Sequence, residues 1–261
     1  MTEQARRNVK LVIAYNGAAY HGWQRQAGSL PTVQQCVEEA AARIVGHPVS
    51  VAGAARTDAG VHAEGQAASF FTTNLAIPLR GLRRAMNSAL PRDIAIRSAE
   101  VAPDDFHASR SAVGKTYRYR VYVAPQRPVA LVGQVYHFWR PLETEPMRDA
   151  ARRLVGTHDF AGFATANEQR ESTVRTIFRC DVAEADSEVH ITCQGDGFLY
   201  NMVRIISGTL IEVGRGRFGG DRIDKALTSL DRRDAGPTAP PEGLCLLCVH
   251  YSPAELNPNR P

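Results

Sequence analysis

The sequence predicts an α+β fold made of two pseudo-symmetric halves, each with the order strand, helix, strand, strand, helix, strand. Two observations lead to this prediction. Short segments with alternating apolar residues, typical of half-buried strands, are separated by segments with apolar residues at helical spacing. The same order of elements then occurs twice, loosely, along the 261 residues. Two such halves favour largely antiparallel sheets, and we expect a central cleft between two ferredoxin-like lobes.

In the first half, turn and capping residues mark most of the boundaries. Thr32 and Gln35 form a capping pattern that starts the first helix, Gly46 ends it, and Pro91 stops the second helix. The expected elements are a strand over 9–15, a helix between 32 and 46, strands over 49–53 and 66–71, a helix over 78–90 and a strand over 94–101.

The second half repeats this order. Its helix before the final loop is marked by apolar residues at 199, 202, 203, 206 and 210. The other expected elements are a strand over 116–123, a helix over 146–155, a hairpin of strands 174–185 and 189–195, a short helix over 221–230 and a strand over 244–251. We therefore expect an N-terminal α+β domain over 1–108, which carries the candidate catalytic aspartate, and a C-terminal α+β domain over 109–261.

Composition restricts the class of protein. Hydrophobic residues make up 44% of the chain and charged residues 22%, which is typical of globular proteins. No apolar run approaches the roughly 18 residues of a membrane span, and the N-terminus lacks a signal-peptide core. We expect a cytoplasmic protein without a membrane segment. Cys245 and Cys248 have the spacing of a redox or zinc motif, but they lie in a strand-like segment and no second pair of ligands accompanies them. We therefore expect no metal site, and we expect the cysteines to be core thiols.

The charge pattern points to a polyanionic partner. The formal net charge is +4, and 28 of the 31 basic residues are arginine. Arginine suits phosphate and base recognition because its planar fork bonds bidentately and stacks, although a genomic codon bias would also raise its number. Clusters of basic residues are better evidence for a polyanionic partner than the total number of arginines. They are Arg80-Arg83-Arg84, Arg110-Lys115-Arg118-Arg120, Arg170-Arg175-Arg179 and Arg215-Arg217-Arg222.

The segment Arg56-Thr57-Asp58 lies on a predicted loop, where binding and catalytic residues are often found. It breaks the alternation between two predicted strands with turn-forming residues, so a guanidinium, a hydroxyl and a carboxylate lie on a short loop held by rigid elements. Taken alone, the triplet favours the other interpretation, in which Asp58 is a turn aspartate that bonds its own backbone.

Five segments together resemble one family, the bacterial tRNA pseudouridine synthases of the TruA type. The resemblance covers nearly the whole chain, and five segments in the right order are highly specific. They are Gly22–Gln26, Arg56–Ala63, Phe106–Ala108 with Lys115–Tyr119, Phe198–Arg204 and Gly243-Leu244. The resemblance implies two pseudo-symmetric α+β domains, a homodimer, no cofactor, no required metal, and conversion of uridine to pseudouridine at positions 38, 39 and 40 of the tRNA anticodon arm.

The resemblance also implies roles for individual residues. Asp58 matches the catalytic carboxylate and Arg204 the active-site arginine beside it. Tyr117 would pack on the flipped uracil, and its phenol is a candidate base for the C5 proton. Arg56 would stack in the space that the uridine vacates, and the matching segment also assigns substrate contacts to Thr57 and His62. Tyr117 shares a predicted strand face with Tyr119 and Val121, which equally fits a core residue.

Three positions depart from the family pattern. Ala55 stands where glycine is usual, which matters only if the backbone there needs a positive φ. The family commonly has arginine directly after the segment that matches Phe106–Ala108, but this chain has Ser109 there and Arg110 next. Neither residue is therefore assigned a role. Cys245 replaces a tyrosine after Gly243-Leu244.

Two other classes of function stay open at this stage. A non-catalytic RNA-binding module would keep the arginine clusters and make Asp58 dispensable. A phosphotransferase or hydrolase with an aspartate nucleophile is ranked last, because the chain has neither a P-loop nor an Asp-x-Asp pair for a metal.

Overall fold

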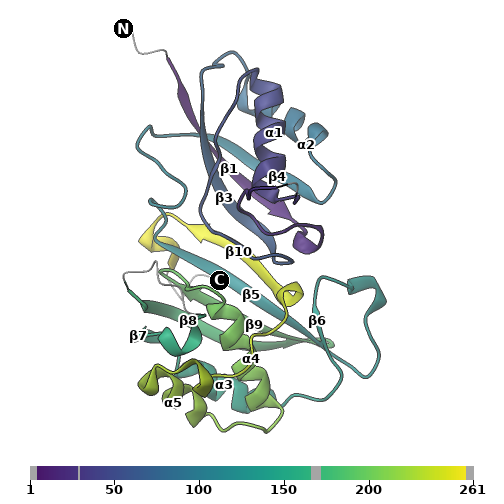
Figure 1. Cartoon of the computed structure of the whole chain (residues 1–261), viewed down its shortest axis with the longest axis vertical. Coiled ribbons are helices and arrows are strands. Elements are labelled where there is room, and N and C mark those ends of the chain that lie inside the picture. The colour runs from purple at the N-terminus through teal and green to yellow at the C-terminus, as the bar shows by residue number, and fades with distance from the viewer. Residues whose placement is uncertain (1–4, 29, 166–171, 257–261) are drawn as a thin grey trace. The chain divides into compact units, whose positions relative to one another are not determined.

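The computed structural model describes residues 5–28, 30–165 and 172–256, which form a mixed α+β protein (Figure 1). The chain divides into two compact units. The first comprises Met1–Ala112 together with Leu246–Tyr251, and the second comprises Val113–Cys245 together with Ser252–Pro261. A C-terminal segment thus returns to the first unit.

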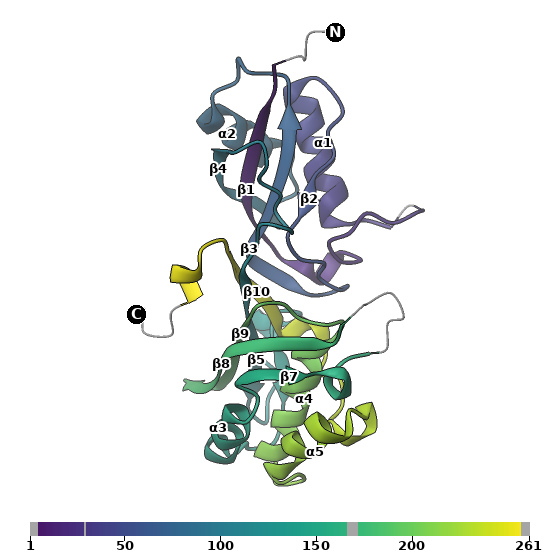
Figure 2. The same cartoon turned by 90° about the vertical axis from the view of Figure 1, so that its left-hand side faces the viewer.

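The first unit is an antiparallel sheet covered by two helices. Its strand order is β4–β1–β3, β2 pairs with β3, and β10 is the next neighbour of β3. Helices α1 and α2 lie on one face of this sheet (Figure 2). The elements are β1 (Arg7–Tyr15), α1 (Val33–Val45), β2 (Ala52–Gly53), β3 (His62–Thr72), α2 (Leu79–Ala89), β4 (Ile94–Ala102) and β10 (Leu244–His250).

Alternation and capping explain these elements. Val9, Leu11 and Ile13 of β1 are fully buried, as the outward and inward alternation of a half-covered strand requires. The Thr32 hydroxyl accepts the N–H of Gln35 at the start of α1, and Gly46 ends the helix with φ +83°. Both predicted ends of this helix are confirmed.

The second unit also combines a sheet with helices. Its strand order is β5–β9–β8–β7, with β6 parallel to β5, and helices α3 and α4 pack on each other. The β8–β9 hairpin turns at Asp186 with φ +52°, where it was predicted. The elements are β5 (Gly114–Val123), β6 (Tyr136–Phe138), α3 (Thr144–Arg152), β7 (Gly156–Asp159), β8 (Val174–Ala185), β9 (Glu188–Gly195), α4 (Met202–Gly214) and α5 (Asp221–Ser229).

The predicted strand over 49–53 is wrong in length. Only Ala52–Gly53 pairs with β3. Val51 is buried, but its backbone N–H donates to Glu38 Oε1 (3.0 Å) and its carbonyl accepts from Gln34 Nε2 (2.8 Å). Side chains of α1 thus take the hydrogen bonds that a strand partner would have made, and β2 shrinks to two residues.

The start of α4 also differs from the prediction. Asn201 adopts a left-handed conformation, with φ +61°, directly before the helix. Tyr200 therefore lies outside the helix, which begins at Met202. The α+β class and the open antiparallel sheets are confirmed, whereas the ferredoxin-like pairing of the halves and the cleft stay predictions.

Candidate functional site

The loop that carries Asp58 is fixed by hydrogen bonds to its backbone and to Thr57. The N–H of Trp23 donates to the carbonyl of Thr57 (3.0 Å), and the N–H of Val61 donates to the carbonyl of Asp58 (3.1 Å). The Thr57 hydroxyl lies 2.7 Å from the hydroxyl of Tyr15 in the interior. Asp58 is half-buried, and Thr57 is buried. The carboxylate therefore projects from a backbone with a defined path.

Two glycines make this path possible. Gly22 has φ +88°, and a Cβ there would lie 2.5 Å from the carbonyl oxygen of Thr57. Gly60, with φ +80°, turns the chain into β3 immediately after the aspartate. L side chains rarely adopt such φ values. The Gly22–Gln26 segment thus supports the loop through close backbone contact.

The substitution of glycine by Ala55 is harmless to the backbone. Ala55 is not among the positive-φ residues. Its N–H donates to Gln66 Oε1 (3.2 Å), and its carbonyl accepts from Gln66 Nε2 (2.7 Å). Gln66 is fully buried on β3, so one carboxamide satisfies both backbone groups of Ala55. Sequence reasoning missed Gln66 and Tyr15; the detectable signal was a glutamine inside an otherwise apolar strand.

The other predicted residues of the first unit differ in exposure. Arg56 is exposed, and its predicted stacking on RNA stays a prediction. His62 is buried at the start of β3, and its Nδ1 accepts the N–H of Gly17 (3.0 Å). This bond gives His62 an anchoring role for the turn at Gly17–Ala19, and its predicted contact with substrate stays a prediction.

Tyr117 lies in the second unit, on β5. Its backbone partner on β9 is Cys193, and its ring packs edge-on against Phe198, with centroids 5.2 Å apart. The side chain is 7% exposed, and Tyr119 and Val121 on the same strand face are fully buried. Burial alone fits a core residue as well as a functional one, so substitution has to separate the two.

Arg204 lies in the first turn of α4, and its guanidinium is held by two hydrogen bonds. Nε donates to the carbonyl of Ala239, and a terminal nitrogen donates to the side-chain oxygen of Asn201, both at 2.8 Å. These contacts fix the direction of the guanidinium. Arg204 is therefore a preorganised cation.

The structure thus brings the predicted residues together in two sets. Arg56, Thr57, Asp58 and His62 belong to the first unit, and Tyr117 and Arg204 to the second. Within the described residues, no group of three or more His, Cys, Asp or Glu side chains could hold a metal ion. Also within them, no helix has the length and apolar composition that a bilayer crossing requires.

The cysteines differ in their surroundings. Cys180 and Cys193 are buried on facing positions of β8 and β9 with sulfurs 3.5 Å apart. The contact with Cys193 and burial both raise the pKa of Cys180. Cys36, Cys245 and Cys248 are half-buried. The expectation of core thiols is thus met by the first pair.

The model of the tRNA pseudouridine synthase family matches residues 11–109 and 150–252 of this chain. That match spans most of the sequence and includes Asp58 and Arg204. The chain belongs to this family.

Close relatives of this tRNA pseudouridine synthase agree with the match. A protein of Syntrophotalea carbinolica is 46% identical over 95% of this chain and 97% of its own length. Proteins of Acetivibrio thermocellus and Geotalea uraniireducens are 45% and 46% identical over 94% of this chain and 100% of their own lengths. All three are named tRNA pseudouridine synthase A. The TruA resemblance is confirmed.

Proposed function

We propose that this chain converts uridine to pseudouridine at positions 38, 39 and 40 in the anticodon arm of tRNA, in the cytoplasm and without a cofactor. The observation that carries the proposal is the Arg56-Thr57-Asp58 segment, which lies on a loop held by hydrogen bonds. The family match of the chain covers residues of both units. The reaction breaks the bond between C1′ and N1, turns the uracil, and joins C5 to C1′. The proton on C5 must leave, and N1 gains one, so no redox partner is required.

Asp58 is proposed as the catalytic carboxylate. A carboxylate can stabilise or attack an electron-poor sugar carbon, as in retaining glycosidases. Attack on C1′, attack on the pyrimidine ring and removal of a sugar proton are the three available routes. In each of these routes, the fixed backbone around Asp58 restricts the direction of its carboxylate. The loop thereby orients the carboxylate relative to the substrate.

Tyr117, Arg204 and Arg56 are proposed to act on the same uridine. The family resemblance gives Arg204 the role of the cation that keeps a desolvated carboxylate ionised, and hydrogen bonds to Ala239 and Asn201 orient its guanidinium. A stacked base must leave its stack before its sugar carbon is accessible. Exposed Arg56 would fill the space it leaves, while Thr57 and His62 contact the substrate beside it. Tyr117 would stack on the uracil and take the C5 proton.

Tritium release is the decisive experiment. Unmodified tRNA labelled with tritium at uracil C5 is incubated with the protein, without metal or cofactor. The proposal requires release of tritium to water in step with pseudouridine formation. RNA binding without release would indicate a binding module, and dependence on a divalent metal with phosphate release would indicate a phosphotransferase or hydrolase.

We further propose that the protein is a homodimer and that its units are related by an internal repeat. In the first unit the strand order β4–β1–β3–β2 follows from one βαββαβ pass, and β5–β9–β8 reproduces the central part of that order in the second. Dimerisation is suggested by the family resemblance and by the size of one chain beside a tRNA. Sedimentation that gives a 28.5 kDa species at micromolar concentration would contradict it.

A further inference from the structure

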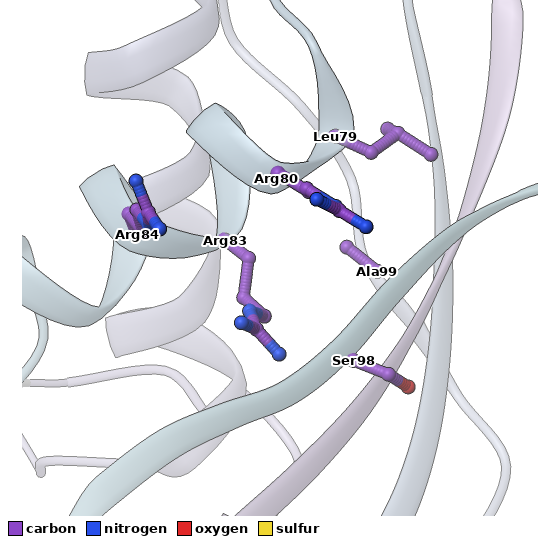
Figure 3. A pocket seen from close by; sticks show the side chains of 6 residues that line it. All are labelled: Leu79, Arg80, Arg83, Arg84, Ser98 and Ala99. Carbon is purple, nitrogen blue, oxygen red and sulfur yellow. The ribbon is translucent and has the colours of Figure 1, made fainter.

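The first unit contains a second polar site, a groove between helix α2 and strand β4. It is a cavity of about 410 Å³ (Figure 3). Its lining, here called the α2 groove, is Leu79, Arg80, Arg83, Arg84, Ser98 and Ala99. The three arginines are exposed. Their spacing of i, i+3 and i+4 puts them on one face of the helix, and Arg80 and Arg83 extend toward the strand that bears Ser98 and Ala99.

The charge of the α2 groove is uncompensated. Among the described residues, no carboxylate forms an ion pair with Arg80, Arg83 or Arg84. Helix α2 contains no acidic residue. The acidic side chains near β4 are already paired: Glu100 lies 2.8 Å from Lys10, and Glu64 lies 3.8 Å from Arg97. Three arginines therefore line one cavity, and in the part of the chain that the structure describes none of them has an acidic partner.

The position of the arginines is fixed by the packing of α2 on the edge strand. Asn87 accepts the N–H of Ile96 (2.7 Å) and donates to its carbonyl (3.0 Å). Arg83 donates to the carbonyl of Arg97 (3.0 Å). These bonds tie the helix to β4 beside the groove. The arginines thus belong to a formed surface rather than to a loose, self-repelling helix.

The α2 groove lies away from the catalytic loop. Tyr15, which contacts Thr57, pairs with Ile94, whereas Ser98 and Ala99 pair with Val12 and Leu11. Three to four residues of strand separate the two places, which is about 10–13 Å at the rise of a β-strand. A ligand in the groove therefore contacts something other than the reacting uridine.

We propose that the α2 groove binds backbone phosphates of the tRNA away from the target uridine, so that it supplies affinity and not chemistry. This inference rests on the proposed function for the identity of the RNA. Arginines without an ion-pair partner suit phosphate oxygens because a guanidinium group can donate two parallel hydrogen bonds. A second copy of this chain fits less well, since a symmetric contact would place two uncompensated positive patches against each other.

The test compares two triple substitutions that remove equal charge. The first is Arg80→Gln with Arg83→Gln and Arg84→Gln. The control is Arg148→Gln with Arg152→Gln and Arg153→Gln, because these arginines are paired with Glu145 and Glu184, Asp149, and Asp224. Affinity for unmodified tRNA is measured by fluorescence anisotropy over a series of KCl concentrations, and single-turnover rates are measured at saturating tRNA.

The α2 triple variant is expected to bind tRNA about 10- to 100-fold more weakly at physiological salt and to lower the slope of log K against log salt by about 2 to 3. The loss should appear in Kd and KM, while kcat carries little of it. The control should match the wild type in both. Thermal unfolding shows whether the variants are folded. The double variant Arg80→Gln with Arg84→Gln keeps the bond from Arg83 to Arg97 and should give about two thirds of the change in salt slope.

Several results would overturn the inference. An α2 triple variant with wild-type Kd and slope excludes a phosphate contact. A changed sedimentation mass with unchanged tRNA Kd assigns the groove to a protein interface. Binding of inorganic phosphate that the triple substitution abolishes, with the tRNA Kd unchanged, assigns the groove to a small anion. If wild-type protein binds tRNA but releases no tritium, the proposed function fails while the groove is still tested by Kd.

Discussion

The loop around Asp58 and the α2 groove lie in the same unit but are built on opposite principles. The loop is held by buried or short-range hydrogen bonds at Thr57, Asp58 and Ala55. The groove is lined by three exposed arginines that have no acidic partner among the described residues. Chemistry depends on angles and on displacements of less than an ångström, which buried hydrogen bonds enforce. Attraction of a polyanion depends on summed charge, which tolerates mobile side chains.

This difference predicts where each substitution will act. Changes in the loop should lower turnover and leave tRNA affinity nearly unchanged, and changes in the groove should do the reverse. A substitution that lowers both equally would show that the two functions are not separate.

The largest effect is expected for Asp58→Asn. This change removes the carboxylate and keeps its shape, so turnover should fall by on the order of 10⁴-fold or more, with tRNA Kd within a few-fold of wild type. Quantification of pseudouridine in tRNA and anisotropy give the two values. Asp104→Asn, at an exposed position of the same unit, is the control. Residual turnover within about tenfold of wild type would remove Asp58 from the catalytic role.

Tyr117 is expected to give the next largest effect and to separate two roles. Tyr117→Phe keeps the ring against Phe198 but removes the phenol oxygen. If that oxygen takes the C5 proton, turnover should fall by about 10²–10⁴-fold with normal binding. Tyr117→Leu should also lose stacking, which is worth about 1–3 kcal/mol. Wild-type turnover in the Phe variant would exclude the base role, and wild-type turnover in the Leu variant would make Tyr117 a core residue.

Gly22→Ala tests whether the path of the loop matters. The added Cβ would lie 2.5 Å from the carbonyl of Thr57, so the backbone before Asp58 must move. We expect about a 10²-fold loss of turnover with tRNA affinity retained. Gly28→Ala is the matched control, because Gly28 also has a positive φ (+100°) but nothing lies within 4 Å of its Cβ position. Equal losses in both variants would attribute the effect to φ alone.

The smallest effect is expected for Arg215→Gln with Arg217→Gln. Both arginines pair with the buried Glu212, at 3.0 and 3.4 Å, so their charge is partly neutralised within the protein. The salt slope of tRNA binding should change by less than about 1, whereas Arg80→Gln with Arg83→Gln should change it by about 2. Thermal melting should show a destabilisation, because Glu212 loses its partners. A slope change equal to that of the α2 pair would contradict the distinction between paired and unpaired clusters.

The sequence predicted those features that depend on local chemistry. The capped helix after Thr32, the hairpin at Asp186 and the turn at Asp58 all follow from residues close in the chain. It did not predict β6 or β7, because three or four residues are too few to show a period. Nor did it show that Arg215 and Arg217 share one carboxylate while Arg80 and Arg84 pair with none in residues 5–28, 30–165 and 172–256, since pairing is a property of the folded chain. Arg170 lies outside the described residues.

The return of residues 246–251 to the first unit has a consequence for how the protein is made. β10 is the neighbour of β3, Leu247 passes close to Gly65, and the Tyr251 hydroxyl donates to the carbonyl of Ala108 (2.8 Å). A ribosome that has finished residue 112 must translate well over a hundred more before this strand exists, roughly 7–30 s at bacterial speeds. During that time the part of the β3 edge that β10 covers stays unpaired. A premature stop codon before residue 246 would leave the unit that carries the catalytic loop without its last strand.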